Sequence, residues 1–428
     1  MLSLLRKTSI DLGPLRRHRD FRLLSLGQIV SYIGSMISFV AIPYQIYQLT
    51  HSSLAVGVSG ALEFLPIVAF SFVGGAIADS ADRRTVLLVT DATLMVCVAI
   101  LALNATVGSA RLWVIYVMGV VIVAVDCIQR PSMDAMLPRL VPAEDMTAAA
   151  AIQGSRGALG MIVGPAVGGA LIAGVGLHWT FWVDVATYAV SLTTLLLMRP
   201  QHPAAGAQRP SLSRMKEGVA YARSRQELMG TYIVDILAMT FGMPIALFPQ
   251  IASHYGGPEV LGLLTGAPAV GSLLATATSG WTARIRRHGI AVTWAACAWG
   301  GAIACFGLAN SLPLALAFLA LAGAADMVSG IFRMTIWNHT TPDALRGRLA
   351  GIELMSYSVG PALSGVESGA VARGFTPRVS VVSGGLLCIG GAIIATLLLP
   401  GYRDYRSPEG PTENDVLAAE IGEQPPLS

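Results

Sequence analysis

The sequence carries little charge for its length. Asp, Glu, Lys and Arg together make up 12% of its 428 residues, whereas soluble domains carry roughly 25%. Apolar residue types fill 54% of the chain, which favours a membrane protein over a soluble one. The net charge of +3 is too small to indicate a nucleic-acid partner. We therefore expect a protein whose partner is the lipid bilayer and not a nucleic acid.

Lysine, patterned cysteine and patterned histidine are missing as well. The chain has two lysines, Lys7 and Lys216, and neither follows a glycine. A phosphate-binding G-K-[ST] loop is therefore excluded, and we expect no nucleotide. The five cysteines lie in apolar runs without disulfide or zinc spacing, and the seven histidines are scattered. With no hydrophilic stretch long enough for a soluble catalytic core, the sequence predicts no enzyme, no cofactor and no metal site.

Long apolar runs are what the sequence does have. A membrane-spanning helix needs roughly 20 mostly apolar residues. Polar or turn-forming segments separate twelve runs of this kind, at residues 21–47, 54–78, 85–106, 112–137, 147–174, 178–198, 228–252, 259–283, 289–309, 313–337, 345–371 and 376–399. We expect an all-α membrane protein with twelve transmembrane helices.

A hydrophilic stretch at residues 199–227 divides the runs six and six. It predicts a central loop between an N-terminal six-helix half, 21–198, and a C-terminal half, 228–400. Residues 1–20 would form a basic cytoplasmic segment before the first half. Residues 401–428 are rich in Pro, Glu and Gly, so we expect a disordered cytoplasmic tail.

The basic residues predict the orientation in the membrane. Of the 28 Lys and Arg, 22 lie in, or within four residues of, the N-terminal segment, the central loop, the other even-numbered loops and the tail. The odd-numbered loops hold three, Arg111, Arg373 and Arg378. Because positive residues collect on the cytoplasmic side, we expect a multi-pass protein of the plasma membrane with both termini and the central loop in the cytoplasm.

The two halves repeat one another in several places. Asp126 and Pro142 recur 200 residues later as Asp326 and Pro342. The tripeptide "VGP" at 163–165 recurs at 359–361, and the proline dipeptide at 42–43 recurs at 243–244. Repeats in the same orientation on either side of a central loop are the plan of many secondary transporters.

The loop after the second run carries the strongest motif. In "GGAIADSADRRTVLL", the residues Gly75, Asp79, Arg83 and Arg84 fit the pattern G-x-x-x-D-x-x-G-R-[KR], while Asp82 replaces its second glycine. On this motif the chain resembles the major facilitator superfamily of transporters over essentially its whole length. The resemblance implies that Asp79 latches the two halves together in one access state. An ordinary turn at the membrane interface is the alternative.

A second motif, "GMIVGPAVGG", lies in the fifth run. Its residues Gly160, Gly164, Pro165, Gly168 and Gly169 fit a pattern associated with drug and metabolite exporters. The proline bends a helix and the glycines leave a smooth face. The resemblance implies that this bend shapes the path along which the halves close against leak, and packing alone is the alternative. A looser likeness at "RPSMDAMLPRLVPAEDMTAAAAI" points to the branch with enterobactin, multidrug and macrolide exporters.

Charged residues inside the runs are the candidate cavity groups. The resemblance implies that runs 1, 4, 7 and 10 line the central cavity. These runs contain Asp126, Arg130, Asp235, Asp326 and Arg333, and Glu63 is embedded in run 2. A charge facing lipid at this depth costs at least a few kcal/mol, so we expect these groups to face a wet cavity or one another.

Asp126 and Arg130 are four residues apart and can pair on one helix face. The pair could be a proton-coupling element or a permanent structural ion pair. Arg156 in run 5 and Glu353 in run 11 lie at nearly matching places in the two repeats. They could form a gating pair or a structural one, and both alternatives stay open.

We predict a proton-coupled exporter of an amphipathic small molecule such as a drug, a macrolide or a siderophore. Its partners would be that substrate and protons, and we expect a monomer. Sparse charge beside Met and aromatic residues on the cavity helices suits such ligands. An importer of a small metabolite with the same fold is the alternative, and a receptor that transports nothing is a third possibility.

Overall fold

The computed structural model describes residues 11–80, 82–108, 110–199, 219–342 and 345–407. Within these ranges the chain is helical, with no strand. The first half contains α2 (Gly13–Arg17), α3 (Arg19–Thr50), α4 (Ser53–Ser80), α5 (Arg83–Thr106), α6 (Leu112–Asp134), α7 (Leu137–Leu140), α8 (Met146–Val175) and α9 (Leu177–Leu196). The second contains α11 (Gln226–Gly242), α12 (Phe248–Tyr255), α13 (Pro258–Ala277), α14 (His288–Leu308), α15 (Leu312–Thr340), α16 (Arg346–Gly374), α17 (Pro377–Leu398) and α18 (Pro400–Arg403).

Ten helical segments of the described residues are long and apolar enough to cross a membrane. Two further long helices, α9 and α16, are not among the ten. The reason is visible in their sequences, because α9 carries the buried polar residues Thr180, Asp184 and Ser191. In α16 the buried serines Ser364 and Ser368 have the same effect. A polar side chain inside a helix bundle can be paired with a neighbour, so low apolarity does not prevent burial.

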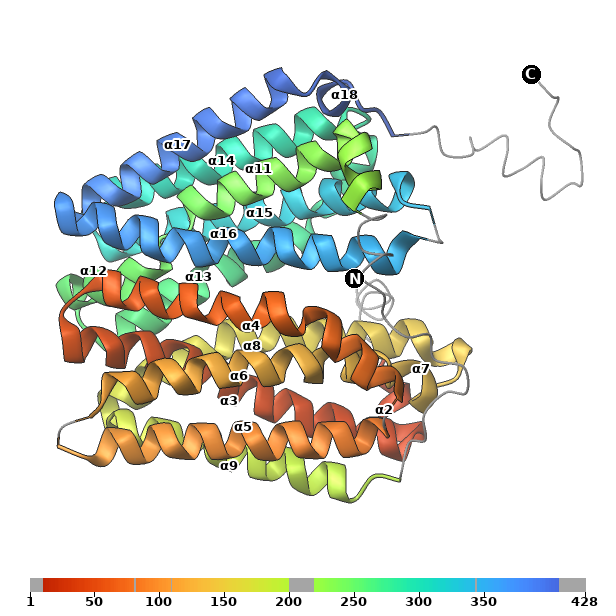
Figure 1. Cartoon of the computed structure of the whole chain (residues 1–428), viewed down its shortest axis with the longest axis vertical. Helices are drawn as coiled ribbons and strands as arrows, with labels where there is room; N and C mark the ends of the chain where they lie inside the picture. The colour runs from red at the N-terminus through yellow and green to blue at the C-terminus, as the bar shows by residue number, and fades with distance from the viewer. Residues whose placement is uncertain (1–10, 81, 109, 200–218, 343–344, 408–428) are drawn as a thin grey trace, which may run out of the picture.

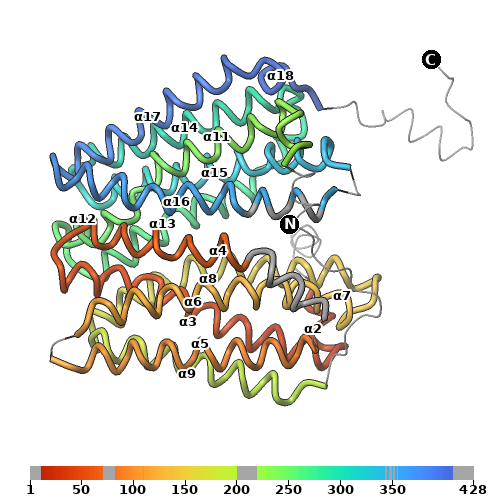
Figure 2. Tube along the Cα trace, viewed as in Figure 1, coloured from red at the N-terminus to blue at the C-terminus, as the bar shows by residue number. Residues whose placement is uncertain are grey.

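The helices form two bundles that lie side by side (Figure 1). Helices α2 to α9 pack mainly with one another, and we call them the N-half; α11 to α18 form the C-half. The tube in Figure 2 shows the same division, with the red-to-yellow-green N-half below the green-to-blue C-half. We call the end at which α3 begins and α17 finishes the basic end, since most arginines lie there. The other end is the opposite end.

The halves contact each other close to the opposite end. Helix α4 packs along α16, and α8 packs along α13. Gly57 of α4 meets the backbone of Gly365, and a Cβ on Gly262 of α13 would clash with the carbonyl of Pro165. Ser53 at the start of α4 donates a hydrogen bond to Oε1 of Gln250 in α12 at 2.7 Å.

Toward the basic end, two glycines of α8 and α4 have open space beside them. Gly157 lies on α8 about two turns before Gly164, and a Cβ added there would meet nothing within 4 Å. Gly60, one turn beyond Gly57 on α4, is equally open. The halves are therefore joined by close backbone contacts at the opposite end, and their ribbons diverge toward the basic end (Figure 1).

The two repeated prolines behave differently. Helix α3 continues through Pro43, whereas the matching Met243–Pro244 ends α11 and is followed by the 3₁₀ turn Ile245–Leu247 and then α12. A proline inside a helix removes one backbone hydrogen bond. In the C-half the carbonyl of Met243 accepts a hydrogen bond from Ser364 at 2.6 Å, which satisfies the broken helix end.

The chain stays ordered further than its composition predicts. Residues 401–407 were expected to belong to a disordered tail, but α18 and the residues up to Ser407 are structured. Tyr402 is fully buried, packs on Gly230 and lies 3.4 Å from Thr293 through its hydroxyl. Burial of this aromatic ring holds residues 401–407 against the C-half, so they do not belong to a disordered tail. Residues 408–428, like most of the predicted central loop, lie outside the described residues.

Candidate functional site

Three predicted cavity residues come together in the C-half. Arg333 of α15 forms an ion pair with Asp235 of α11, and its Nη2 lies 3.5 Å from Oδ1 of Asp326. The side chain of Asp235 is 4% exposed, that of Arg333 21% and that of Asp326 38%. The arginine is therefore shared between one buried carboxylate and one that faces open space. Arg333 Nε has no hydrogen-bond partner in the described structure, so the guanidinium is incompletely satisfied.

The matching residues of the N-half do not pair. Asp126 and Arg130 are both exposed on α6, and none of the ion pairs among the described residues joins them. Asp126 nevertheless lies within electrostatic range of Arg130 and of Arg156 on α8. The predicted i, i+4 contact is thus absent, and the two charges stand separately on the open side of the N-half.

Arg156 and Glu353 do not contact each other in the described structure. The guanidinium of Arg156 lies over the ring of Tyr32 of α3, 5.0 Å from its centroid, and Nη1 is 3.5 Å from the sulfur of Met133. Glu353 lies within electrostatic range of Arg333 and Asp235 instead. Both residues sit toward the basic end, where the halves are apart, so each interacts within its own half.

Glu63 of α4 lies against α6. A Cβ added to Gly119 would be 3.0 Å from its carboxylate oxygen Oε1. The glycine therefore leaves the room that this half-buried acid occupies between two helices of the N-half. Glu63 makes no ion pair with another described residue.

The signature loop is described from Asp82 onward. Asp82 caps α5 by accepting a hydrogen bond from the backbone N–H of Thr85 at 2.8 Å, so the residue that replaces the motif's glycine acts as an N-cap. Arg83 donates to the carbonyl of Ala135 at 2.8 Å, and Arg84 donates to those of Leu195 and Leu196. The two arginines thus hold the C-terminal ends of α6 and α9, where helix carbonyls favour cations. For Gly75 and Asp79, the structure describes the backbone of α4 but not the surroundings of the residues.

The glycine-proline motif of α8 contacts two different helices. Gly160, Gly164 and Gly168 pack on Tyr32, Met36 and Ile37 of α3 in the same half. Gly169 and Pro165 meet the backbone of α13 in the C-half. These small residues allow close helix approach. One motif therefore joins α8 to its own half and to the partner half.

Two buried carboxylates escaped the sequence analysis. Asp91 of α5 is fully buried; it accepts hydrogen bonds from the amide of Gln129 on α6 and from the hydroxyl of Ser191 on α9, the latter at 2.6 Å. Asp184 of α9 is also fully buried and accepts from Ser38 of α3 and from Thr187. Neither forms an ion pair with a described residue, so neutral donors alone satisfy them.

A simple signal could have revealed these acids. Asp91 and Asp184 each lie inside an apolar run, six residues after its first residue, and an ionisable residue embedded in a span is a functional candidate by default. The partner of Asp91, Gln129, adjoins the predicted cavity residue Arg130 on α6.

Solved structures share this architecture. The nucleoside transporter NupG is 14% identical, with a TM-score of 0.70 over 90% of this chain and 98% of its own. A bacterial homologue of the iron transporter ferroportin in an inward-facing state is 12% identical, with a TM-score of 0.66 over 90% and 98%. At this identity the likeness concerns the fold, which is that of the major facilitator superfamily.

A family model described as transmembrane secretion effector matches residues 9–424, and the chain belongs to this family of major facilitator transporters. The enterobactin exporter EntS of Citrobacter koseri is 28% identical over 402 residues, 93% of this chain and 96% of the relative. EntS of Escherichia coli is 27% identical over 408 residues, 95% and 98% of the two chains. The protein is thus a multi-pass membrane transporter.

Proposed function

We propose that this transporter is a proton-coupled exporter of an amphipathic small molecule that works by alternating access. The observation that carries the proposal is the arrangement of the two halves: they meet at the opposite end and are apart at the basic end. Charged residues from both halves lie toward the open side. A ligand could therefore enter from the basic end and leave after the halves rock to the other arrangement.

The direction of transport follows from the predicted orientation. If the basic end is cytoplasmic, as its arginines suggest, the described state accepts substrate from the cytoplasm. The names of the two relatives support export and suggest a siderophore as one candidate substrate. The small-residue contacts of α8 with α13 would then seal the outer end while substrate loads.

The coupling would use carboxylates on both cavity faces. Asp126 is exposed and unpaired, so it can exchange a proton without breaking an ion pair. Asp326 shares Arg333 with the buried Asp235, so protonation of either acid would shift the arginine toward the other. Asp79 would latch the halves in the opposite arrangement, as the family motif implies.

Transport by the purified protein in liposomes tests the proposal. We expect enterobactin or erythromycin to accumulate against its concentration only when a proton gradient is imposed, and a protonophore should abolish the accumulation. The protease accessibility of the tail would report the orientation of each preparation. Accumulation that ignores the gradient would contradict proton coupling, and net movement toward the basic end would identify an importer.

The orientation has its own test. A reporter that works only in the cytoplasm should be active when fused near Ser211 and inactive near Ser52. The reverse pattern would invert the proposed direction of export.

A further inference from the structure

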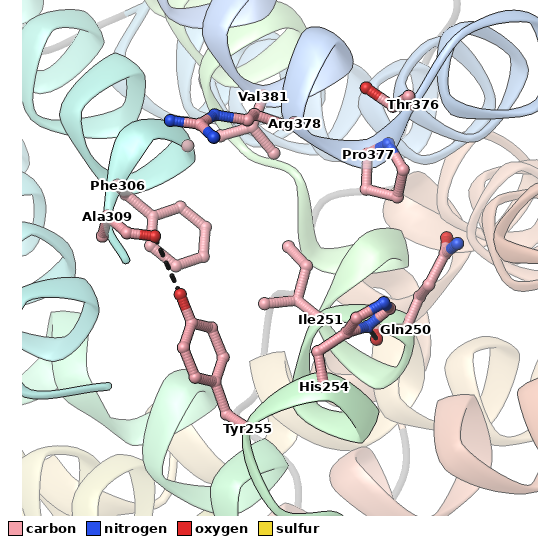
Figure 3. Close-up of a pocket in the computed structure, with 11 residues that line it drawn as sticks. Gln250, Ile251, His254, Tyr255, Phe306, Ala309, Thr376, Pro377, Arg378 and Val381 are labelled. Atoms are coloured by element: carbon pink, nitrogen blue, oxygen red, sulfur yellow. Dashed lines mark hydrogen bonds between the residues drawn. The ribbon is translucent and has the colours of Figure 1, made fainter. Parts of the chain in front are cut away.

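A cavity lies at the opposite end of the C-half, and none of the charged residues of the candidate functional site lines it. It has a volume of about 300 Å³ and lies between α12, the last turn of α14 and the first turn of α17 (Figure 3). Binding sites for small molecules start at about this size. The apolar part of its wall comes from Ile251, Phe306, Pro377 and Val381.

The positive charge of this cavity comes from Arg378. Only three arginines were assigned to the loops of this end, so a cation here is unusual. Its Nη2 donates to the carbonyl of Leu308 at 3.4 Å, and none of the ion pairs among the described residues includes it. Figure 3 shows Arg378 and Phe306 on one side of the cavity, with His254 and Gln250 across from them.

Gln250 and His254 offer further polar atoms. Oε1 of Gln250 accepts the hydrogen bond from Ser53, which leaves the amide Nε2 without a partner among the described residues. Nδ1 of His254 lies 2.9 Å from the carbonyl of Gln250 and must donate to it, so Nε2 is the free ring nitrogen. The hydroxyl of Tyr255 donates to the carbonyl of Ala309 at 2.9 Å, and this hydrogen bond joins α12 to the end of α14 in the cavity wall.

We propose that this cavity binds a small amphipathic anion, with a carboxylate or phosphate head at Arg378 and Gln250 and an apolar body against Phe306 and Ile251. No Asp or Glu is among the residues that line it, so no side chain of the wall carries a negative charge. Hydrogen bonds between a guanidinium and an anionic oxygen are among the stronger ones in proteins. The ligand could come from water as a free anion or from the bilayer as a lipid headgroup.

Calorimetric titration of the full chain in nanodiscs of zwitterionic lipid tests the site. Phenylacetate and phenyl phosphate should bind saturably, while phenylacetamide, which has the shape of phenylacetate but no charge, should bind much more weakly. The variant Arg378→Gln should bind both anions about ten- to hundredfold more weakly, since it loses a charge-assisted hydrogen bond. Arg373→Gln removes an exposed arginine at the same end that does not line the cavity, and it should bind like the unmodified chain.

Two further arms distinguish the sources. If a lipid headgroup is the natural ligand, nanodiscs that contain phosphatidylglycerol should weaken phenylacetate binding to the unmodified chain. If a free anion is the ligand, lipid composition should leave the affinity unchanged, and inorganic phosphate should compete weakly. Equal affinity in Arg378→Gln and the unmodified chain, equal binding of phenylacetamide, or no saturable binding of either anion would overturn the proposal.

Discussion

Asp126 and Asp326 occupy matching places in the two halves, but their surroundings differ. Asp326 lies 3.5 Å from Arg333, which also pairs with the buried Asp235. Asp126 is exposed and has Arg130 nearby without an ion pair. One half therefore joins its cavity charges into a network, whereas the other half leaves them separate.

The contacts of α5 with α9 in the N-half and of α14 with α17 in the C-half show the opposite difference. In the N-half, α5 and α9 are linked by the carboxylate of Asp91 and the hydroxyl of Ser191. In the C-half, the corresponding helices α14 and α17 are linked by two hydroxyls, those of Thr293 and Thr396, at 2.7 Å. The same duplicated scaffold thus places a buried acid between packing helices in one half and beside an arginine in the other.

We infer from this difference that the charged residues of the two halves have different roles. A charge that is tied to partners on two helices resists removal, because its loss leaves a buried group unpaired. A charge that stands free can change protonation at little structural cost. We therefore expect stability to depend more on the C-half network, and coupling to depend more on Asp126. We expect the loss in the free energy of unfolding to decrease from Arg333 through Asp91 and Thr293 to Asp126.

Arg333→Gln should destabilise the protein by about 3–5 kcal/mol, because it leaves the carboxylate of Asp235 buried without its counter-charge. Thermal unfolding of the purified protein in detergent measures the effect. Arg130→Gln is the control on the matching helix and should change stability little. The double variant Asp235→Asn, Arg333→Gln should recover most of the loss. Equal destabilisation by the two arginine variants would contradict the contrast between halves.

Asp91→Ala should cost about 1–3 kcal/mol for each donor left without its acceptor, Gln129 on α6 and Ser191 on α9. Asp91→Asn retains one acceptor oxygen and should lose less. The same unfolding assay measures both variants. If alanine and asparagine behave alike and neither is destabilising, the buried acid does not hold α5, α6 and α9 together.

Thr293→Val should cost about 1 kcal/mol, the usual contribution of one neutral hydrogen bond. This change removes the hydroxyl that pairs with Thr396 in the C-half but keeps the side-chain volume. The expected loss is smaller than for Asp91→Ala at the corresponding place. A loss as large as that of Asp91→Ala would show that the helix contacts of the two halves are equivalent.

Asp126→Asn should leave the stability within about 0.5 kcal/mol, as expected for an exposed residue without an ion pair. It should nevertheless abolish accumulation against a gradient, since an amide cannot exchange a proton, while downhill movement continues. Asp134→Asn, an exposed acid two turns further along α6, serves as the control and should retain accumulation. Full gradient-driven transport by Asp126→Asn would remove Asp126 from the coupling scheme.

The sequence predicted the family, the membrane character and most of the helices, because long apolar runs and the "GGAIAD" motif are local patterns. It also singled out Asp235, Asp326 and Arg333, which the structure brings together. It could not show that Arg333 serves both acids, since Asp235 lies about a hundred residues away on another helix. The absence of contact between Asp126 and Arg130 was equally unpredictable, because i, i+4 spacing permits a contact without requiring one.

The close packing of α9 and α16 has a consequence for how the chain is made. Both helices fall outside the ten segments that are long and apolar enough to cross a membrane, so neither is expected to partition into lipid readily by itself. Each forms a hydrogen bond with a residue that is synthesised earlier. Asp184 of α9 accepts from Ser38 of α3, and Ser364 of α16 donates to the carbonyl of Met243 after α11. When α9 and α16 are synthesised, the helices that carry these partners, α3 and α11, are therefore already in the membrane.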